Sequence, residues 1–66
     1  MSYLLVLSDE EKNRVITPCC TLEDAMLMAL SDSYGRAFRV LDLQAKSWVP
    51  GAQLLMARLA VVDGQI

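Results

Sequence analysis

The feature that most constrains this 66-residue chain is an apolar run near its start, SYLLVL, at residues 2–7. Side chains of a β-strand point alternately to the two faces of a sheet, and here both alternating sets are apolar. Such a strand is typical of the centre of a sheet, where both of its faces need cover. The polar segment SDEEKN follows, and residues 14–17, RVIT, then resume β character until Pro18, which is expected to end the strand. The pattern predicts a β-hairpin with the first strand at the centre of the sheet.

A helix is predicted over residues 22 to about 33. Thr21 suits the N-cap position, and Glu23 and Asp24 place negative charge in the first turn, where the helix dipole favours it. Gly35 follows as a residue able to take a positive φ. The apolar residues recur at the spacing of one buried stripe, which consists of Leu22, Ala25, Met26, Ala29 and Leu30.

The second half of the chain is less regular. Residues 36–43, RAFRVLDL, predict a third strand, and residues 47–49, SWV, indicate a possible short fourth strand before Pro50 and Gly51. Residues 52–62 fit a helical apolar stripe, yet RLAVV before DG also fits a strand. Of the two, we expect the helix.

The predicted fold is a single α+β domain over residues 1–66. Its antiparallel sheet has the strand order 2-1-3 with a possible short fourth strand, and the first helix packs on one face. The other face of the central strand then needs the C-terminal segment or a second copy of the chain to cover it.

Cys19 and Cys20 stand directly before the predicted helix. Neighbouring Cα atoms are about 3.8 Å apart, below the usual disulfide window of about 4.4 to 6.8 Å, so the two are not expected to pair. A thiol at a helix N-terminus can have a lowered pKa, and a thiol-based redox protein is therefore one hypothesis. The chain contains no histidine to act as a base. We favour a packing role where strand meets helix, because reduced cysteine is among the most buried residue types.

Other chemistry has little support. A zinc site would need both cysteines together with carboxylates, and adjacent cysteines lack the usual ligand spacing. The carboxylates at residues 9–11 fit a solvated loop, and the sequence carries no glycine-rich phosphate-binding motif. We predict no catalytic, cofactor-binding or metal-binding residues, and a protein that is not an enzyme.

Apolar residues are abundant for so short a chain. They make up 55% of the sequence, against about 45–50% in an average globular protein. A surplus of this kind usually ends in an interface, and we expect a two-fold homodimer. The predicted dimer interface consists of Leu54, Leu55, Leu59 and Val62. The predicted partner-binding residues are Leu27, Met28, Trp48, Arg36 and Arg39.

Charge and hydropathy restrict the kind of partner. Six basic and eight acidic residues give a net charge of −2, which disfavours binding to nucleic acid. The alternative prediction is nevertheless a small nucleic-acid-binding protein that uses Arg36, Arg39, Lys46 and Trp48. No apolar run approaches membrane-spanning length and no signal peptide is evident, so we expect a cytoplasmic protein with reduced cysteines.

Short proteins with a hairpin, a helix and a strand in this order recur among bacterial and phage accessory proteins, including some anti-CRISPR inhibitors. The chain is similar to them in size and predicted topology alone, and no shared motif supports a family assignment or a function. The leading hypothesis, drawn from the surplus of apolar residues, is a noncatalytic protein-binding module that forms a homodimer or docks on a larger complex and acts as a small regulator or inhibitor.

Overall fold

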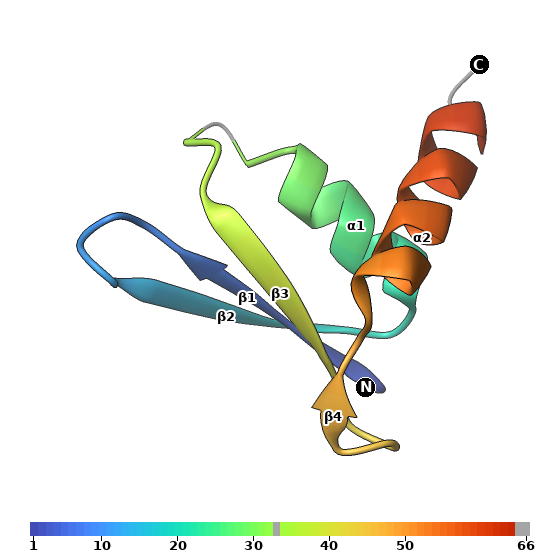
Figure 1. Cartoon of the computed structure of the whole chain (residues 1–66), viewed down its shortest axis with the longest axis horizontal. Coiled ribbons are helices and arrows are strands. Elements are labelled where there is room, and N and C mark those ends of the chain that lie inside the picture. The colour runs from blue at the N-terminus through green and yellow to red at the C-terminus, as the bar shows by residue number, and fades with distance from the viewer. Residues whose placement is uncertain (33, 65–66) are drawn as a thin grey trace.

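The computed structural model describes residues 1–32 and 34–64 (Figure 1). The four strands form one antiparallel sheet in the order β2-β1-β3-β4. The predicted α+β fold, with the first strand inside the sheet and a short fourth strand, is confirmed. Its elements are, in chain order, β1 (Tyr3–Ser8), β2 (Arg14–Cys19), α1 (Leu22–Leu30), β3 (Ala37–Asp42), β4 (Ser47–Trp48) and α2 (Gly51–Gly64).

The loop of the β1–β2 hairpin satisfies its own polar groups. The Asp9 carboxylate accepts a hydrogen bond of 2.8 Å from the backbone N–H of Asn13 and one of 3.2 Å from its side-chain amide. β2 continues through Pro18 to Cys19, so the prediction that Pro18 ends the strand is wrong. Proline is tolerated there because β2 lies at the edge of the sheet, where one side of the strand needs no ladder hydrogen bonds.

Helix α1 begins as its sequence predicts and ends earlier. The Thr21 hydroxyl accepts a hydrogen bond of 3.1 Å from the backbone N–H of Asp24 and caps the helix. The helix ends at Leu30 with Ser31 as its C-cap; the predicted end, Ser33, lies outside the described residues.

The main core lies between β1, β3 and α1. Leu5 and Val40 are fully buried there, on the face of the sheet that α1 covers. Met26 is also buried, as predicted, but Leu30 is 42% exposed and belongs to neither core cluster. The prediction for Leu30 is wrong because it is the last residue of a nine-residue helix, beyond the part of α1 that packs on the core.

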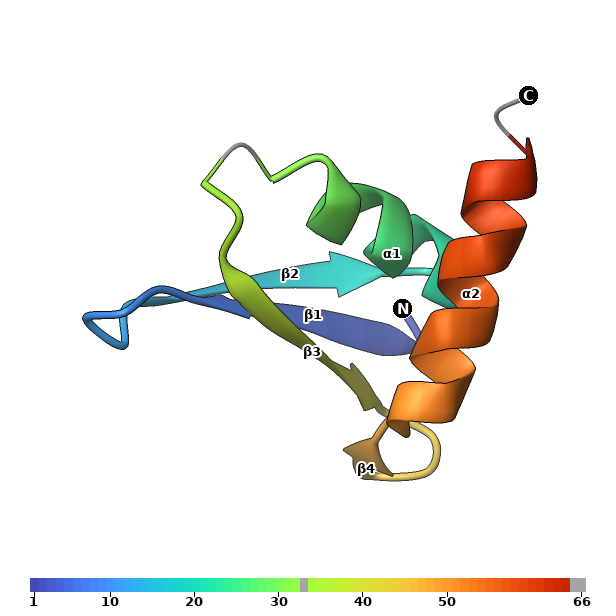
Figure 2. The same cartoon turned by 45° about the horizontal axis from the view of Figure 1, so that its top comes forward.

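The C-terminal segment is a helix, as expected, but it does not cover the second face of the sheet. Ala57 and Val61 of α2 pack against Met26 of α1 and form a second core cluster. Both helices therefore lie on the same side of the sheet, and α2 rises beside α1 from the edge at β4 (Figures 1 and 2). Within residues 1–32 and 34–64, no helix lies over the opposite face of the sheet.

Candidate functional site

The face of the sheet turned away from the helices is the candidate site, and we call it the open face. Because Leu5 and Leu7 point into the core, the alternate β1 residues point to the other side. Residues directly opposite in neighbouring strands share a face, so the strand register extends this set across the sheet. The open face consists of Leu4, Val6, Ser8, Arg14, Ile16, Pro18, Ala37, Arg39, Leu41 and Trp48.

The apolar residues of the open face gather at one end of the sheet. Leu4 lies between Pro18 and Leu41 in the register, and Leu41 pairs in turn with Trp48. These four side chains make one apolar row across all four strands. Ile16 stands next to the row on the edge strand and is 59% exposed.

An arginine and the single tryptophan of the chain meet on this face. The guanidinium carbon of Arg39 lies 4.4 Å from the centroid of the Trp48 ring, within the range of a cation–π contact. The two residues are diagonal neighbours in the register, because Trp48 pairs with Leu41, two positions beyond Arg39. The stacked guanidinium group and indole ring form a flat, partly exposed surface at the β3–β4 edge.

The charge of the open face differs in sign from that of the whole chain. Its ten residues include Arg14 and Arg39 and no aspartate or glutamate, which gives +2. The chain has a net charge of −2, so the remaining residues carry −4. The open face is therefore an apolar and cationic surface on an acidic protein.

A second exposed apolar surface lies on α2, and we call Leu55, Leu59 and Val62 the outer stripe. Their side chains are 58%, 53% and 45% exposed. At 100° per residue they fall on the side of α2 opposite to Ala57 and Val61, which pack on α1. Leu54, the fourth residue of the predicted dimer interface, is half-buried and packs against both core clusters.

The other predicted partner-binding residues lie apart from the open face. Leu27 and Met28 are partly exposed on α1. Arg36 precedes β3 and forms an ion pair of 2.8 Å with Asp32. Of the five predicted partner-binding residues, the structure brings together Arg39 and Trp48.

The ion pair between Arg36 and Asp32 closes the turn before β3. The Asp32 carboxylate also accepts a hydrogen bond of 2.8 Å from the backbone N–H of Arg36. Hydrogen bonds from the Arg36 side chain, followed by the one from its backbone, lower the pKa of Asp32. The same pairing raises the pKa of Arg36, so this arginine has a structural partner already.

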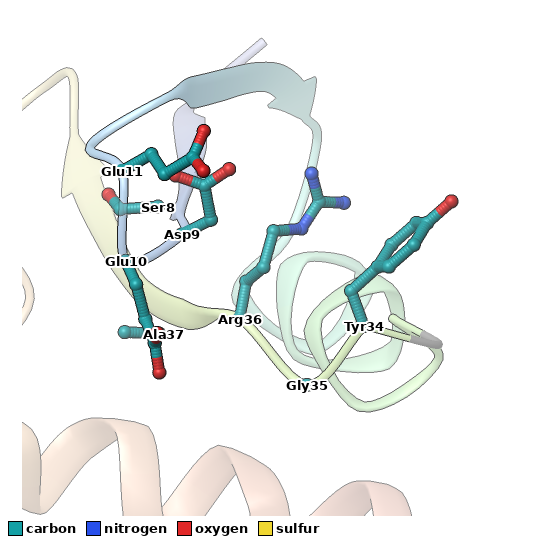
Figure 3. Close-up of a pocket in the computed structure, with 8 residues that line it drawn as sticks. All are labelled: Ser8, Asp9, Glu10, Glu11, Tyr34, Gly35, Arg36 and Ala37. Atoms are coloured by element: carbon teal, nitrogen blue, oxygen red, sulfur yellow. The ribbon is translucent and has the colours of Figure 1, made fainter.

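An open hollow lies between the β1–β2 loop and the residues before β3 (Figure 3). Carboxylates from the loop line one side, and Tyr34 and Arg36 line the other. A hydrogen bond from the Asn13 backbone is the main cause that lowers the pKa of Asp9. Because Asp32 already balances the charge of Arg36, the hollow is acidic overall.

The two cysteines face different surroundings. Cys19 is buried on the core face of β2, where its thiol lies 3.7 Å from the carbonyl oxygen of Thr17 and 3.7 Å from the sulfur of Met28. Burial, reinforced by the charge of Asp24, raises the pKa of the Cys19 thiol. Cys20 is exposed, and both cysteines are free. A raised pKa makes Cys19 a poor nucleophile at neutral pH.

In residues 1–32 and 34–64, no three cysteine or carboxylate side chains are grouped so that they could hold a metal ion. No helix in these ranges has the length and apolar character needed to cross a lipid bilayer.

Comparisons of the chain with protein-family models, with curated proteins and with solved structures found no match.

Sequence reasoning missed most of the open face. It singled out Trp48 and Arg39 but not the residues beside them, such as Leu4, Val6 and Ile16. The signal was present in the alternation of the first strand, whose two faces are both apolar. The sequence did not show which of the two faces the C-terminal segment leaves uncovered.

Proposed function

We propose that this protein is a noncatalytic protein-binding module and that the open face is its binding surface. The observation that carries the proposal is the apolar row across four strands together with the Arg39–Trp48 stack. Tryptophan and arginine are the residue types most enriched among interface hot spots, and both combine a flat apolar surface with polar groups at the rim.

The charge of the open face defines the chemistry of the partner. Arg39 lies in the rank next to the apolar row, together with Ile16, and Arg14 lies one rank further along the edge strand. The ten residues of the face include no carboxylate to oppose an acidic partner. Complementary charge favours encounter and suppresses wrong partners. The partner in this proposal is a protein segment that presents apolar side chains together with aspartate or glutamate.

The biological setting follows from the same proposal. In this proposal the open face occupies a site on a larger protein, and the small protein acts in this way as a regulator or an inhibitor. We place the protein in the cytoplasm, where its two free cysteines remain reduced.

The nucleic-acid alternative rests on the same stack, because an exposed tryptophan beside an arginine also suits an unpaired base. The acidic charge of the whole chain opposes it, and Arg36 is engaged by Asp32. The buried thiol of Cys19, with its raised pKa, gives the redox alternative no support.

Site-specific photo-crosslinking tests the proposal. A photoreactive amino acid is introduced at Ile16 or at Val15 in separate variants that are expressed in the native host. Both side chains are exposed on the edge strand, at 59% and 43%, and they point to opposite faces. Val15 is thus a matched control one residue away from the open face.

The expected result is a protein adduct from position 16 and none from position 15. The adduct should disappear when Arg39→Glu or Trp48→Ala is added, and its mapped site should contain acidic and apolar residues. Equal adducts from both positions, no adduct, or an adduct with nucleic acid would each overturn the proposal, and the last would favour the alternative.

A further inference from the structure

We infer that the outer stripe of α2 is a self-association surface, on which α2 of a second copy packs in parallel. This inference concerns a different surface from the open face and does not depend on it. A surface helix normally turns a polar side to solvent. Here Leu55, Leu59 and Val62 are about half exposed or more, so α2 is apolar on two opposite sides and α1 covers one of them.

Together with Ala52, the outer stripe has the spacing of a coiled-coil seam. Ala52, Leu55, Leu59 and Val62 are separated by three, four and three residues, which is the a-d-a-d spacing of the heptad repeat. The residues that pack on α1, Ala57 and Val61, then fall at positions f and c, away from the seam. One side of α2 thus packs in the core of its own protomer, and the side with the a and d positions remains exposed.

The charges beside the seam select a second copy in parallel orientation. In this register Arg58 occupies position g and Asp63 position e. In a parallel pair a g residue faces the e residue five positions later on the other helix. Arg58 therefore lies opposite Asp63 of the second copy. The two-fold symmetry repeats this contact, so the dimer has two such pairs. In an antiparallel pair position g faces g and e faces e, so that like charges would share a flank.

Both residues are available for this contact. Arg58 and Asp63 are exposed, and the ion pair found within residues 1–32 and 34–64 is the one between Arg36 and Asp32. Position e also holds Met56, which is 69% exposed, so the charges that select the pairing are those of Arg58 and Asp63. The occupant of the outer stripe is therefore one further copy of this chain.

Charge reversal with rescue tests the pairing, with sedimentation equilibrium of the full chain as the readout. Arg58→Glu and Asp63→Lys should each raise the Kd of the dimer about tenfold, because two attractive contacts become repulsive. The double variant should restore the Kd of the natural protein. Arg39→Glu changes the net charge by the same amount as Arg58→Glu but lies on the open face, so it should leave the Kd unchanged.

Orientation is tested with a cysteine at Ala52 in a Cys20→Ser background. In a parallel pair the two copies of residue 52 lie across the seam from each other, and a disulfide between them should form on mild oxidation. In an antiparallel pair centred near Leu59 they would be about 20 Å apart, at 1.5 Å per residue. Disulfide formation is followed by mass spectrometry of the linked peptides.

Three results for the natural protein and the charge variants would overturn the inference. They are a natural protein that remains monomeric up to millimolar concentration, a Kd that the charge reversals do not change, and a double variant that is not rescued. Leu59→Asp should abolish the dimer while its circular dichroism spectrum stays that of a folded chain, because Leu59 is 53% exposed. A dimer that survives Leu59→Asp also contradicts the inference.

Discussion

The two faces of β1 carry almost the same residues, but one face is buried and the other remains accessible. Leu5 and Leu7 point toward α1 and are buried, whereas Leu4 and Val6 point to the open face and remain partly accessible. The difference comes from α2, which packs against α1 instead of crossing to the other face. A strand that is apolar on both faces thus shows that each face of the sheet needs a packing layer. The placement of the last helix decides which face stays uncovered.

Replacing Leu5 should give the largest effect, because it removes a side chain from the covered face. Leu5 is completely buried between the sheet and α1, and Leu5→Ala should lower the free energy of unfolding by about 2 to 5 kcal/mol. Urea denaturation followed by circular dichroism measures the loss. A loss below about 1 kcal/mol would mean that this face is not the tightly packed one.

Thiol labelling compares the reaction rates of two adjacent cysteines, one on the covered face and one exposed to solvent. Cys19 is buried with a raised pKa and Cys20 is exposed, so a maleimide at neutral pH should modify Cys20 first. The labelling of Cys19 requires local opening and should be slower by about two orders of magnitude, equivalent to about 2.7 kcal/mol. Peptide mass spectrometry assigns the modified residue, and labelling of Cys19 at the rate of Cys20 would contradict its burial.

Leu4→Ala is the matched counterpart of Leu5→Ala on the open face. The truncation leaves no closed cavity, because no layer packs over Leu4, and the loss of unfolding free energy should be about 1 kcal/mol. The same urea experiment measures it. If Leu4→Ala and Leu5→Ala lowered the free energy of unfolding equally, the two faces would be equally covered in solution. A second copy packed on the open face would give this result.

Most of the fold could be predicted from short stretches of the sequence. Thr21 caps α1, Gly35 has a positive φ of 63°, and the sheet order follows from the hairpin, the crossover and the apolar centre. Pro18 and Leu30 were predicted wrongly because their outcome depends on neighbours outside their own segment. Pro18 is accepted in a strand because that strand lies at an edge, and Leu30 is exposed because the core ends before the helix does.

The candidate site was harder to predict, because a surface depends on the relative placement of elements. Trp48 and Arg39 stood out by residue type, but their contact requires the β3–β4 register, which a two-residue strand hardly reveals in sequence. The outer stripe was predicted from its apolar residues. Leu54 was predicted for the same interface, and in the structure it is half-buried and packs against both core clusters because α1 lies on that side of α2.

The smallest effect is expected from acid, and it should involve neither face of β1. The pKa values of Asp9 and Asp32 are lowered from 3.8 by hydrogen bonds in the turns at the ends of the strands, and the open face has no carboxylate among its ten residues. A carboxyl group with a lowered folded pKa contributes stability that is present above the unfolded pKa and is lost as the pH falls through the folded pKa. The urea midpoint should therefore be constant at neutral pH and should decrease as the pH falls below 3.8.

Asp32→Asn separates this effect from the packing of the two faces. Asparagine cannot ionise, so the variant should be less stable at neutral pH and should lose less stability on acidification than the natural protein does. Leu4→Ala is the control, because it changes the open face and should keep the full acid dependence. If Asp32→Asn and the natural protein lost stability in parallel as the pH falls, the acid response would come from carboxylates other than Asp32, and the turn before β3 would not be its source.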